Sequence, residues 1–130
     1  MLTLEEVLSD VAMSPGFNNV EKVSVDSRGD DGQSPLHWMA TLGDAVGIRL
    51  LVEAGASINA IDNKGSTPLH EAAVWRQTLA ARELIEQGAD VLLRNLAGLT
   101  PLDIAKSDGF GPTIELLMLK APGPRFNTIR

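Results

Sequence analysis

Ser34-Pro35-Leu36-His37 recurs as Thr67-Pro68-Leu69-His70 and again as Thr100-Pro101-Leu102-Asp103, so each copy begins 33 residues after the previous one. A hydroxyl residue followed by proline is typical of a helix start, because the side-chain oxygen accepts hydrogen bonds from free backbone N–H groups and proline tolerates the first helical position. The three copies therefore predict three helices that begin at a constant spacing. A fixed period of this length is typical of stacked repeats and not of a single globular core.

Residues outside the phrase keep the same interval. Gly32, Gly65 and Gly98 each stand two residues before a copy, so an extended finger before each helix also repeats. Each of these glycines is predicted to adopt a backbone geometry that a Cβ would make costly. A second helix follows each copy and, in the first two units, is predicted to end at Gly55 and Gly88. One unit is therefore a finger followed by a helix–turn–helix.

These patterns divide the chain into an N-terminal cap, three units and a tail. Thr3 and Glu6 form a capping-box pattern, which predicts a short amphipathic helix that covers the first unit. Pro112 is predicted to mark the start of the second helix of the last unit. The predicted boundaries are 1–28 for the capping helix and lead-in turn, 29–61, 62–94 and 95–121 for the three units, the last of them as C-terminal cap, and 122–130 for a flexible tail. Phe126 and Ile129 leave a second interpretation open, in which the tail folds back over the last unit.

The composition favours a soluble intracellular protein, and we expect it in the cytoplasm. Of 130 residues 44% are hydrophobic, yet no run of about 18 apolar residues and no basic start before an apolar stretch is present, so neither a membrane-spanning helix nor a signal peptide is expected. Cysteine is absent, which removes disulfides, thiol nucleophiles and zinc–thiolate sites. The formal net charge of −6 disfavours binding to nucleic acid or to an anionic membrane.

The middle unit carries a resemblance to a known family. It reads Gly65-Ser66-Thr67-Pro68-Leu69-His70-Glu71-Ala72-Ala73 and, further on, Leu84-Ile85-Glu86-Gln87-Gly88-Ala89-Asp90. This pattern resembles the ankyrin repeat, and the resemblance covers Gly29 to about Ala121. It implies an all-α ankyrin-repeat solenoid of stacked helix-turn-helix units with short extended β-hairpin-like fingers, as in small stand-alone bacterial-type ankyrin proteins.

His37, His70 and Asp103 hold the same place in successive units, and their residue types also suit metal binding or proton transfer. The resemblance implies a structural role instead, in which each imidazole hydrogen-bonds a neighbouring turn and ties one repeat to the next. The sequence departs from the family pattern in three places: Asp103 replaces the histidine, Arg76 replaces the glycine that the other units carry between their helices, and Gly111-Pro112 interrupts the third unit. No Ser-His-acid set or phosphate-binding glycine loop stands out from chance. We therefore predict no catalytic residue, no metal site and no cofactor.

The candidate binding residues are those that vary where the repeat is constant. The resemblance implies that the finger tips and the exposed side of each unit's first helix form a concave surface that binds partners. Carried onto this sequence, the partner-binding set is Asp30, Asp31, Gln33, Thr41, Leu42, Asn63, Lys64, Ser66, Val74, Trp75, Leu96, Leu99, Ser107 and Asp108. Trp75 stands out, because a large apolar ring with one N–H donor is typical of an interface anchor. The alternative for Trp75 is packing over Arg76 or a neighbouring turn, and Trp38 is expected to pack.

Charge and hydrophobicity are distributed unevenly along the predicted groove. The acidic residues on or near the first finger are Glu21, Asp26, Asp30, Asp31 and Asp44, and apolar residues gather at the other end as Val74, Leu96 and Leu99. A cluster of acidic residues is usually a charged face exposed to water. On a binding groove, however, acidic residues at one end and apolar residues at the other suit a partner protein with a basic patch beside an apolar one.

We hypothesise a non-catalytic protein–protein interaction module that is monomeric when free, and more narrowly an immunity or inhibitor protein that neutralises a bacterial toxin. The alternative is a structural or assembly adaptor that self-associates or scaffolds a complex.

Overall fold

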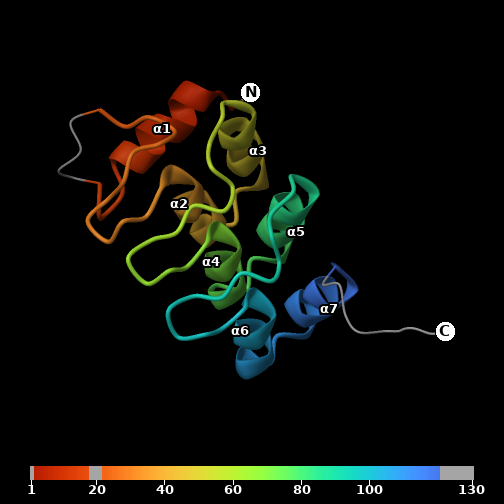
Figure 1. Cartoon of the computed structure of the whole chain (residues 1–130). Helices are drawn as coiled ribbons and strands as arrows, with labels where there is room; N and C mark the ends of the chain where they lie inside the picture. Colours follow the sequence, from red (N-terminus) through yellow and green to blue (C-terminus); the bar gives the residue numbers. More distant parts are fainter. Residues whose placement is uncertain (1, 18–21, 121–130) are drawn as a thin grey trace.

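The structure, a computed structural model, describes residues 2–17 and 22–120. Within these residues the chain forms seven α-helices and no β-strand (Figure 1). The helices are α1 (Leu4–Ala12), α2 (Pro35–Leu42), α3 (Ala45–Glu53), α4 (Pro68–Val74), α5 (Thr78–Glu86), α6 (Pro101–Asp108) and α7 (Gly111–Lys120). The predicted tail at 122–130, with Phe126 and Ile129, lies outside the described residues, and so does Glu21.

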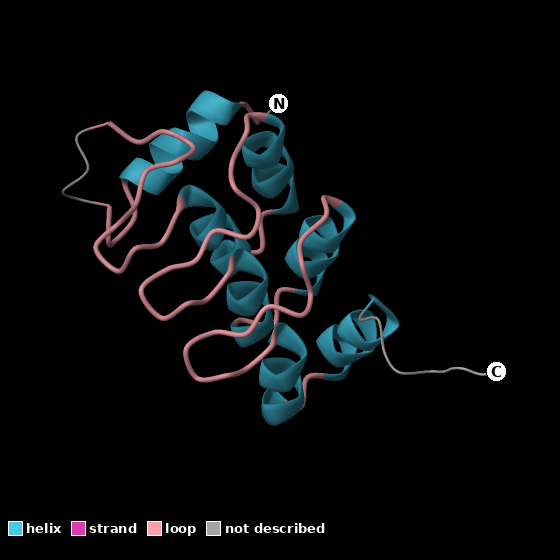
Figure 2. Cartoon of the chain, viewed as in Figure 1, coloured by secondary structure: helices cyan, strands magenta, loops and turns pink. Residues whose placement is uncertain are grey.

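The helices form two rows, and the loops between units project to one side of them. The first helices of the units, α2, α4 and α6, lie side by side, and the second helices, α3, α5 and α7, form a row behind them (Figure 2). At the N-terminal end of the rows, α1 packs against α2 and α3. The predicted all-α solenoid of stacked helix pairs is therefore confirmed.

Each first helix begins at the hydroxyl–proline phrase through the same pair of hydrogen bonds. The His37 N–H donates to Ser34 Oγ at 3.3 Å, and the Ser34 N–H donates to His37 Nδ1 at 3.1 Å. The second copy repeats both bonds at the same distances. In the third copy the Asp103 carboxylate accepts from the Thr100 N–H at 3.0 Å. Aspartate can replace histidine here because either side chain supplies the acceptor that closes a capping box.

The two imidazoles also bond the following repeat. His37 Nε2 donates to the Ser66 carbonyl at 2.7 Å, and His70 Nε2 donates to the Leu99 carbonyl at 2.8 Å. The Nε2 proton is assigned from these partners, because Nδ1 already accepts the N–H of the cap residue. Both rings are buried, and this burial lowers the pKa of each histidine although the carbonyl bond opposes the change. The predicted structural role of His37 and His70 is therefore confirmed.

The fingers are loops that join one another without forming a sheet in the described part of the chain. Each finger turns back on itself through a backbone hydrogen bond, and single backbone bonds join neighbouring fingers. The Asn63 N–H donates to the Asp31 carbonyl at 2.9 Å, and the Leu96 N–H donates to the Lys64 carbonyl at 3.0 Å. At this second contact Gly65 has a φ of 72°, and a Cβ there would lie 3.0 Å from the Leu96 nitrogen. The prediction for this glycine is confirmed.

Arg76 occupies the left-handed region, with a φ of 57°, where the equivalent turns carry Gly43 and Gly109. This region is unfavourable for a residue with a Cβ. The side chain of Arg76 crosses to the next repeat, where Nε donates to Asp108 Oδ2 at 2.7 Å and the guanidinium lies 5.4 Å from the centroid of the Phe110 ring. These contacts offset the backbone strain and explain how the turn accommodates the departure from glycine.

Leu36 and Leu69 from the repeated phrases pack with Ile48, Leu51 and Leu84 from the second helices in a core between the two rows, and none of the five is more than 1% exposed. The core fixes the inner faces of the first helices. Their outer faces, together with the fingers, remain available for a site.

Both histidines are expected to titrate below pH 6.5, their usual pKa, because burial disfavours the charged imidazole. The unfolded chain then binds protons that the folded chain excludes. Stability from this source is complete above pH 6.5 and falls as the pH decreases below it, by up to about 1.4 kcal/mol per pH unit for each histidine.

The chain contains two histidines, so their Hε1 signals in an NMR titration give both pKa values directly. In His70→Gln the free energy of unfolding should depend less steeply on pH below 6.5 than in the wild type. A midpoint at or above 6.5 for either imidazole contradicts the expectation.

Candidate functional site

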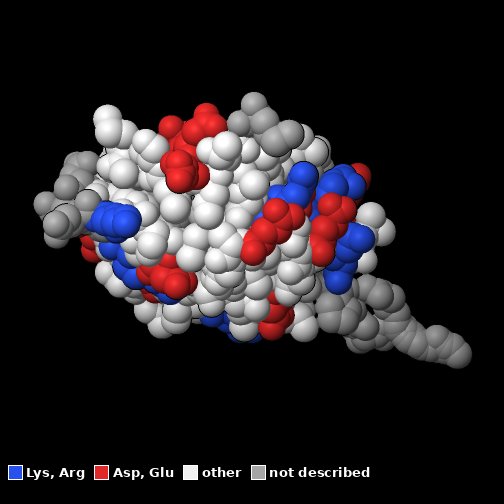
Figure 3. All heavy atoms as spheres, turned by 90° about the horizontal axis from the view of Figure 1, so that it is seen from above, with Lys and Arg blue, Asp and Glu red and all other residues white. Residues whose placement is uncertain are grey.

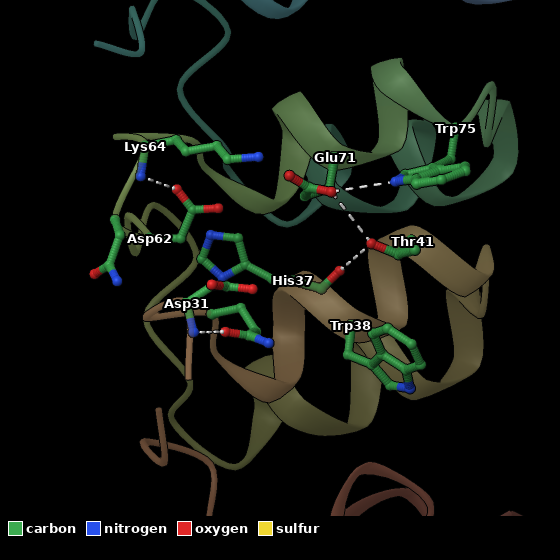
Figure 4. A pocket seen from close by; sticks show the side chains of 10 residues that line it. Asp31, His37, Trp38, Thr41, Asp62, Lys64, Glu71 and Trp75 are labelled. Carbon is green, nitrogen blue, oxygen red and sulfur yellow. Dashed lines mark hydrogen bonds between the residues drawn. The ribbon is translucent and has the colours of Figure 1, made fainter. Parts of the chain in front are cut away.

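A hollow of about 230 Å³ opens between the first two repeats, on the face formed by the fingers and the first helices (Figure 4). Its lining residues are Asp31, Gln33, His37, Trp38, Thr41, Asp62, Asn63, Lys64, Glu71 and Trp75. Pockets for drug-sized molecules begin at roughly 300 Å³. The size of the hollow therefore suits a single side chain of a larger partner.

The two tryptophans of the chain both border this hollow, Trp38 from α2 and Trp75 from the end of α4. Trp38 is half-buried and packs against the core, as expected, whereas Trp75, which follows α4 directly, is 56% exposed. The Trp75 indole N–H donates to Glu71 Oε2 at 3.3 Å, because residues four apart share one face of a helix. Arg76 lies over Phe110 and does not carry the indole as the packing alternative supposed.

Glu71 is a half-buried carboxylate of the hollow. Its Oε2 also lies 3.4 Å from the hydroxyl of Thr41, which shares its one proton between this carboxylate and the nearer carbonyl of His37 at 3.1 Å (Figure 4). Burial raises the pKa of Glu71, and the charge of Asp62 adds to the rise, although the hydrogen bonds from Trp75 and Thr41 and the charge of Lys64 oppose it. Within the described ranges, 2–17 and 22–120, no lysine or arginine forms an ion pair with this carboxylate.

The lining of the hollow is acidic overall. Asp31, Asp62 and Glu71 contribute carboxylates, and Lys64 contributes an ammonium group. His37 is neutral near pH 7, because burial lowers its pKa. Asp31 and Asp62 lie on the finger side of the hollow, whereas the carboxylate of Glu71 lies on the helix side with the two indoles (Figure 4).

The surface of the second helices is different in charge. On the side away from the fingers, acidic and basic side chains are interleaved (Figure 3). Arg49 of α3 and Glu83 of α5 form an ion pair of 3.3 Å there. A surface that neutralises its own charges attracts a charged partner less than an acidic hollow does, so electrostatics favour the finger side for binding.

The structure brings six of the predicted binding residues together at the hollow: Asp31, Gln33, Thr41, Asn63, Lys64 and Trp75. Others are exposed elsewhere on the surface, namely Asp30, Leu42, Val74, Leu96, Leu99, Ser107 and Asp108. Of these, Asp108 is the ion-pair partner of Arg76. A role of these residues in binding a partner stays a prediction.

Two positions are corrected by the structure. Ser66 is only 7% exposed, and its carbonyl accepts the hydrogen bond from His37, so this residue supports the finger and does not present its side chain to a partner. Asp44 does not lie on the first finger, because its Oδ1 accepts from the Gly47 N–H at 2.8 Å and caps α3.

Asp62 and Glu71 were missed by the analysis of the sequence. Glu71 holds the place in the second unit that Trp38 holds in the first, directly after the histidine, and it precedes Trp75 by four residues. These two spacings were the available signals for Glu71. Asp62 begins its finger and accepts hydrogen bonds from the N–H groups of Lys64 and Ser66, which is typical of a turn residue and gave no sign of a site.

The described residues contain no group of three or more histidine, aspartate and glutamate side chains that could hold a metal ion. None of the helices that the structure describes has the length and hydrophobicity to cross a membrane.

Comparison with known families gives one finding. The family model described as ankyrin repeats, in three copies, matches residues 11–95. The match begins within α1 and ends before α6, so the third helix pair lies beyond it although it repeats the same arrangement. No curated protein matches the chain. The boundaries proposed for the individual units stay a prediction.

Glu71 is expected to titrate above its usual pKa of 4.5, because burial disfavours the carboxylate. Trp75→Phe removes the indole donor and should raise the pKa of Glu71 further, since a hydrogen bond to the charged form stabilises it. Carboxyl ¹³C shifts followed against pH measure both values. Glu83 is the internal control and should titrate below 4.5, because its hydrogen bond from Gln87 lowers its pKa. A midpoint for Glu71 at or below that of Glu83 contradicts the expectation.

Proposed function

The chain belongs to the ankyrin-repeat family, and we propose that it is a non-catalytic protein that binds another protein on the face formed by its fingers and first helices. Ankyrin repeats are generally protein–protein interaction modules and are typically non-catalytic. The observation that carries the proposal for this face is the hollow between the first two repeats, where the exposed indole of Trp75 stands beside the carboxylate of Glu71.

The position of Trp75 supports its role as the anchor of the interface. Tryptophan is enriched among residues that dominate binding energy, because its ring removes a large apolar area from water. The bond from its N–H to Glu71 holds the ring beside the hollow before any partner arrives. A side chain that is already ordered loses less entropy on binding.

Charge supports a basic partner. The chain carries a net charge of −6, and carboxylates of Asp31, Asp62 and Glu71 line the hollow. On the third finger, Leu96 and Leu99 add exposed apolar surface. We propose that the partner presents a basic patch beside an apolar one, and that opposite charge speeds their encounter.

Within this class, the more specific proposal is an immunity or inhibitor protein that neutralises a bacterial toxin. Proteins that act on nucleic acids hold the phosphate backbone with lysine and arginine. A small acidic protein that covers such a surface blocks access of the substrate without any chemistry of its own. The net charge of −6 and the acidic hollow support this role.

Capture of a partner tests the binding face. Trp75→Ala is expected to weaken binding of the captured partner by about 2 kcal/mol or more, as loss of an interface anchor does. Asp31→Lys should mainly slow association, because it reverses a charge at the rim. Surface plasmon resonance with the purified partner measures the dissociation constant and the association rate of each variant.

The matched controls lie on the second helices. Leu79→Ala removes an exposed apolar side chain of α5, and Glu53→Lys reverses an exposed charge at the end of α3. Both controls should bind as the wild type does. Equal binding by Trp75→Ala, Asp31→Lys and the wild type would sink the proposed face.

A second candidate function, self-association in an assembly, is favoured by exposed apolar side chains on the last repeat. Leu96 on the third finger is 80% exposed, and Leu119 of α7 is 78% exposed.

Light scattering over a range of concentrations separates this candidate from the first, for which we expect a monomer throughout. A mass that rises with concentration in the wild type and not in Leu119→Lys would support assembly, whereas a constant monomer mass would remove it.

A further inference from the structure

We propose that the hollow between the first two repeats receives an arginine side chain of the partner protein, with the guanidinium against the indole of Trp75 and hydrogen-bonded to the carboxylate of Glu71. This inference rests on the proposed function, in which a partner docks on this face. It adds the chemistry of the group that enters the hollow.

The first argument is the incomplete set of partners around Glu71. Its Oε2 accepts from the Trp75 indole at 3.3 Å and from the Thr41 hydroxyl at 3.4 Å, whereas no donor bonds Oε1 among the residues that the structure describes. The carboxylate is half-buried and forms no ion pair with any described residue. A carboxylate withdrawn from water is stabilised by a cation that also donates hydrogen bonds.

The second argument is the balance of charge in the hollow. Carboxylates of Asp31, Asp62 and Glu71 face the ammonium of Lys64, which leaves the negative charge in excess because His37 is neutral. One further cation therefore enters an attractive field even with Lys64 in place. An anionic group such as a phosphate or a carboxylate is repelled by the same lining.

The third argument is the aromatic wall, which favours arginine over lysine. Trp38 and Trp75 border the hollow with ring surface, and a guanidinium stacks on indole faces because it is planar and weakly hydrated. Its several donors in a fixed fork suit Glu71 together with a second carboxylate of the lining, whereas an ammonium acts as one compact charge. A volume of about 230 Å³ is sufficient for one such side chain.

Because the two tryptophans of the chain both border the hollow, intrinsic fluorescence of the wild-type protein reports on its occupancy. The probes are three capped tripeptides at equal ionic strength, in which the central residue between two glycines is arginine, lysine or citrulline. Citrulline keeps the shape of arginine and lacks its charge. We expect saturable binding of the arginine peptide, about tenfold weaker binding of the lysine peptide and no saturable response to the citrulline peptide.

Substitutions test whether the fluorescence response to the arginine peptide arises at the hollow. Glu71→Gln retains an acceptor for Trp75 and Thr41 and removes the charge, so it should weaken the arginine peptide about tenfold, as loss of a charge-assisted hydrogen bond does. The matched control is Glu115→Gln, which removes a charge from an exposed position of α7 and should change nothing. Thermal unfolding of each variant confirms that it is folded, and the three peptides on the wild type decide the question without any variant.

Each contrary result has a definite meaning. A citrulline or lysine peptide that binds as tightly as the arginine peptide overturns the proposal, and so does an arginine response without saturation. If the peptides give such a result while Trp75→Ala still weakens partner binding, the binding face stands and the group that enters the hollow is not arginine. If neither Trp75→Ala nor Asp31→Lys changes partner binding while the arginine peptide still binds the wild type, the proposed binding face is wrong instead.

Discussion

The buried hydrogen bond from His37 Nε2 to the Ser66 carbonyl, with its counterpart from His70 to Leu99, is the interaction on which the stack depends. One imidazole closes the cap of its own helix with Nδ1 and fixes the next finger with Nε2. A single side chain thus sets both the start of a helix and the distance to the following repeat. Asp103 can perform the first task and lacks the atom for the second. Its place is the last repeat, where no described repeat follows.

The residues that join the repeats and the residues that line the hollow are neighbours on the same helices. His37 and His70 point into the stack, and the residues directly after them, Trp38 and Glu71, line the hollow. Adjacent residues of a helix point in different directions, so two constraints coexist without conflict. The fingers reinforce the arrangement. The backbone hydrogen bond from the Asn63 N–H to the Asp31 carbonyl joins the first two fingers, which carry the Asp31 and Asp62 carboxylates of the hollow. The hollow therefore keeps its shape as a result of the stacking itself.

The period of the repeat, the helix starts and the structural role of the histidines could be predicted from the sequence, because each depends on local chemistry repeated at equal spacing. The hollow could not, since it joins Trp38 and Trp75, which occupy different places in their units and meet only through stacking. Burial of Glu71 has the same origin. Ser66 was wrongly predicted to face a partner, because the sequence places it on a finger, whereas its exposure depends on the contact with His37.

The turn at Arg76 has a consequence for how this sequence can change. An arginine with a φ of 57° is tolerated where Asp108 and Phe110 of the next repeat receive its side chain. Without the carboxylate of Asp108 and the ring of Phe110, the same backbone strain would lack these contacts. Arg76→Gly would relieve the strain and leave the solvent-accessible carboxylate of Asp108 without its ion-pair partner. The three residues are therefore energetically coupled across two repeats, so that the effect of replacing one of them depends on whether the other two are present.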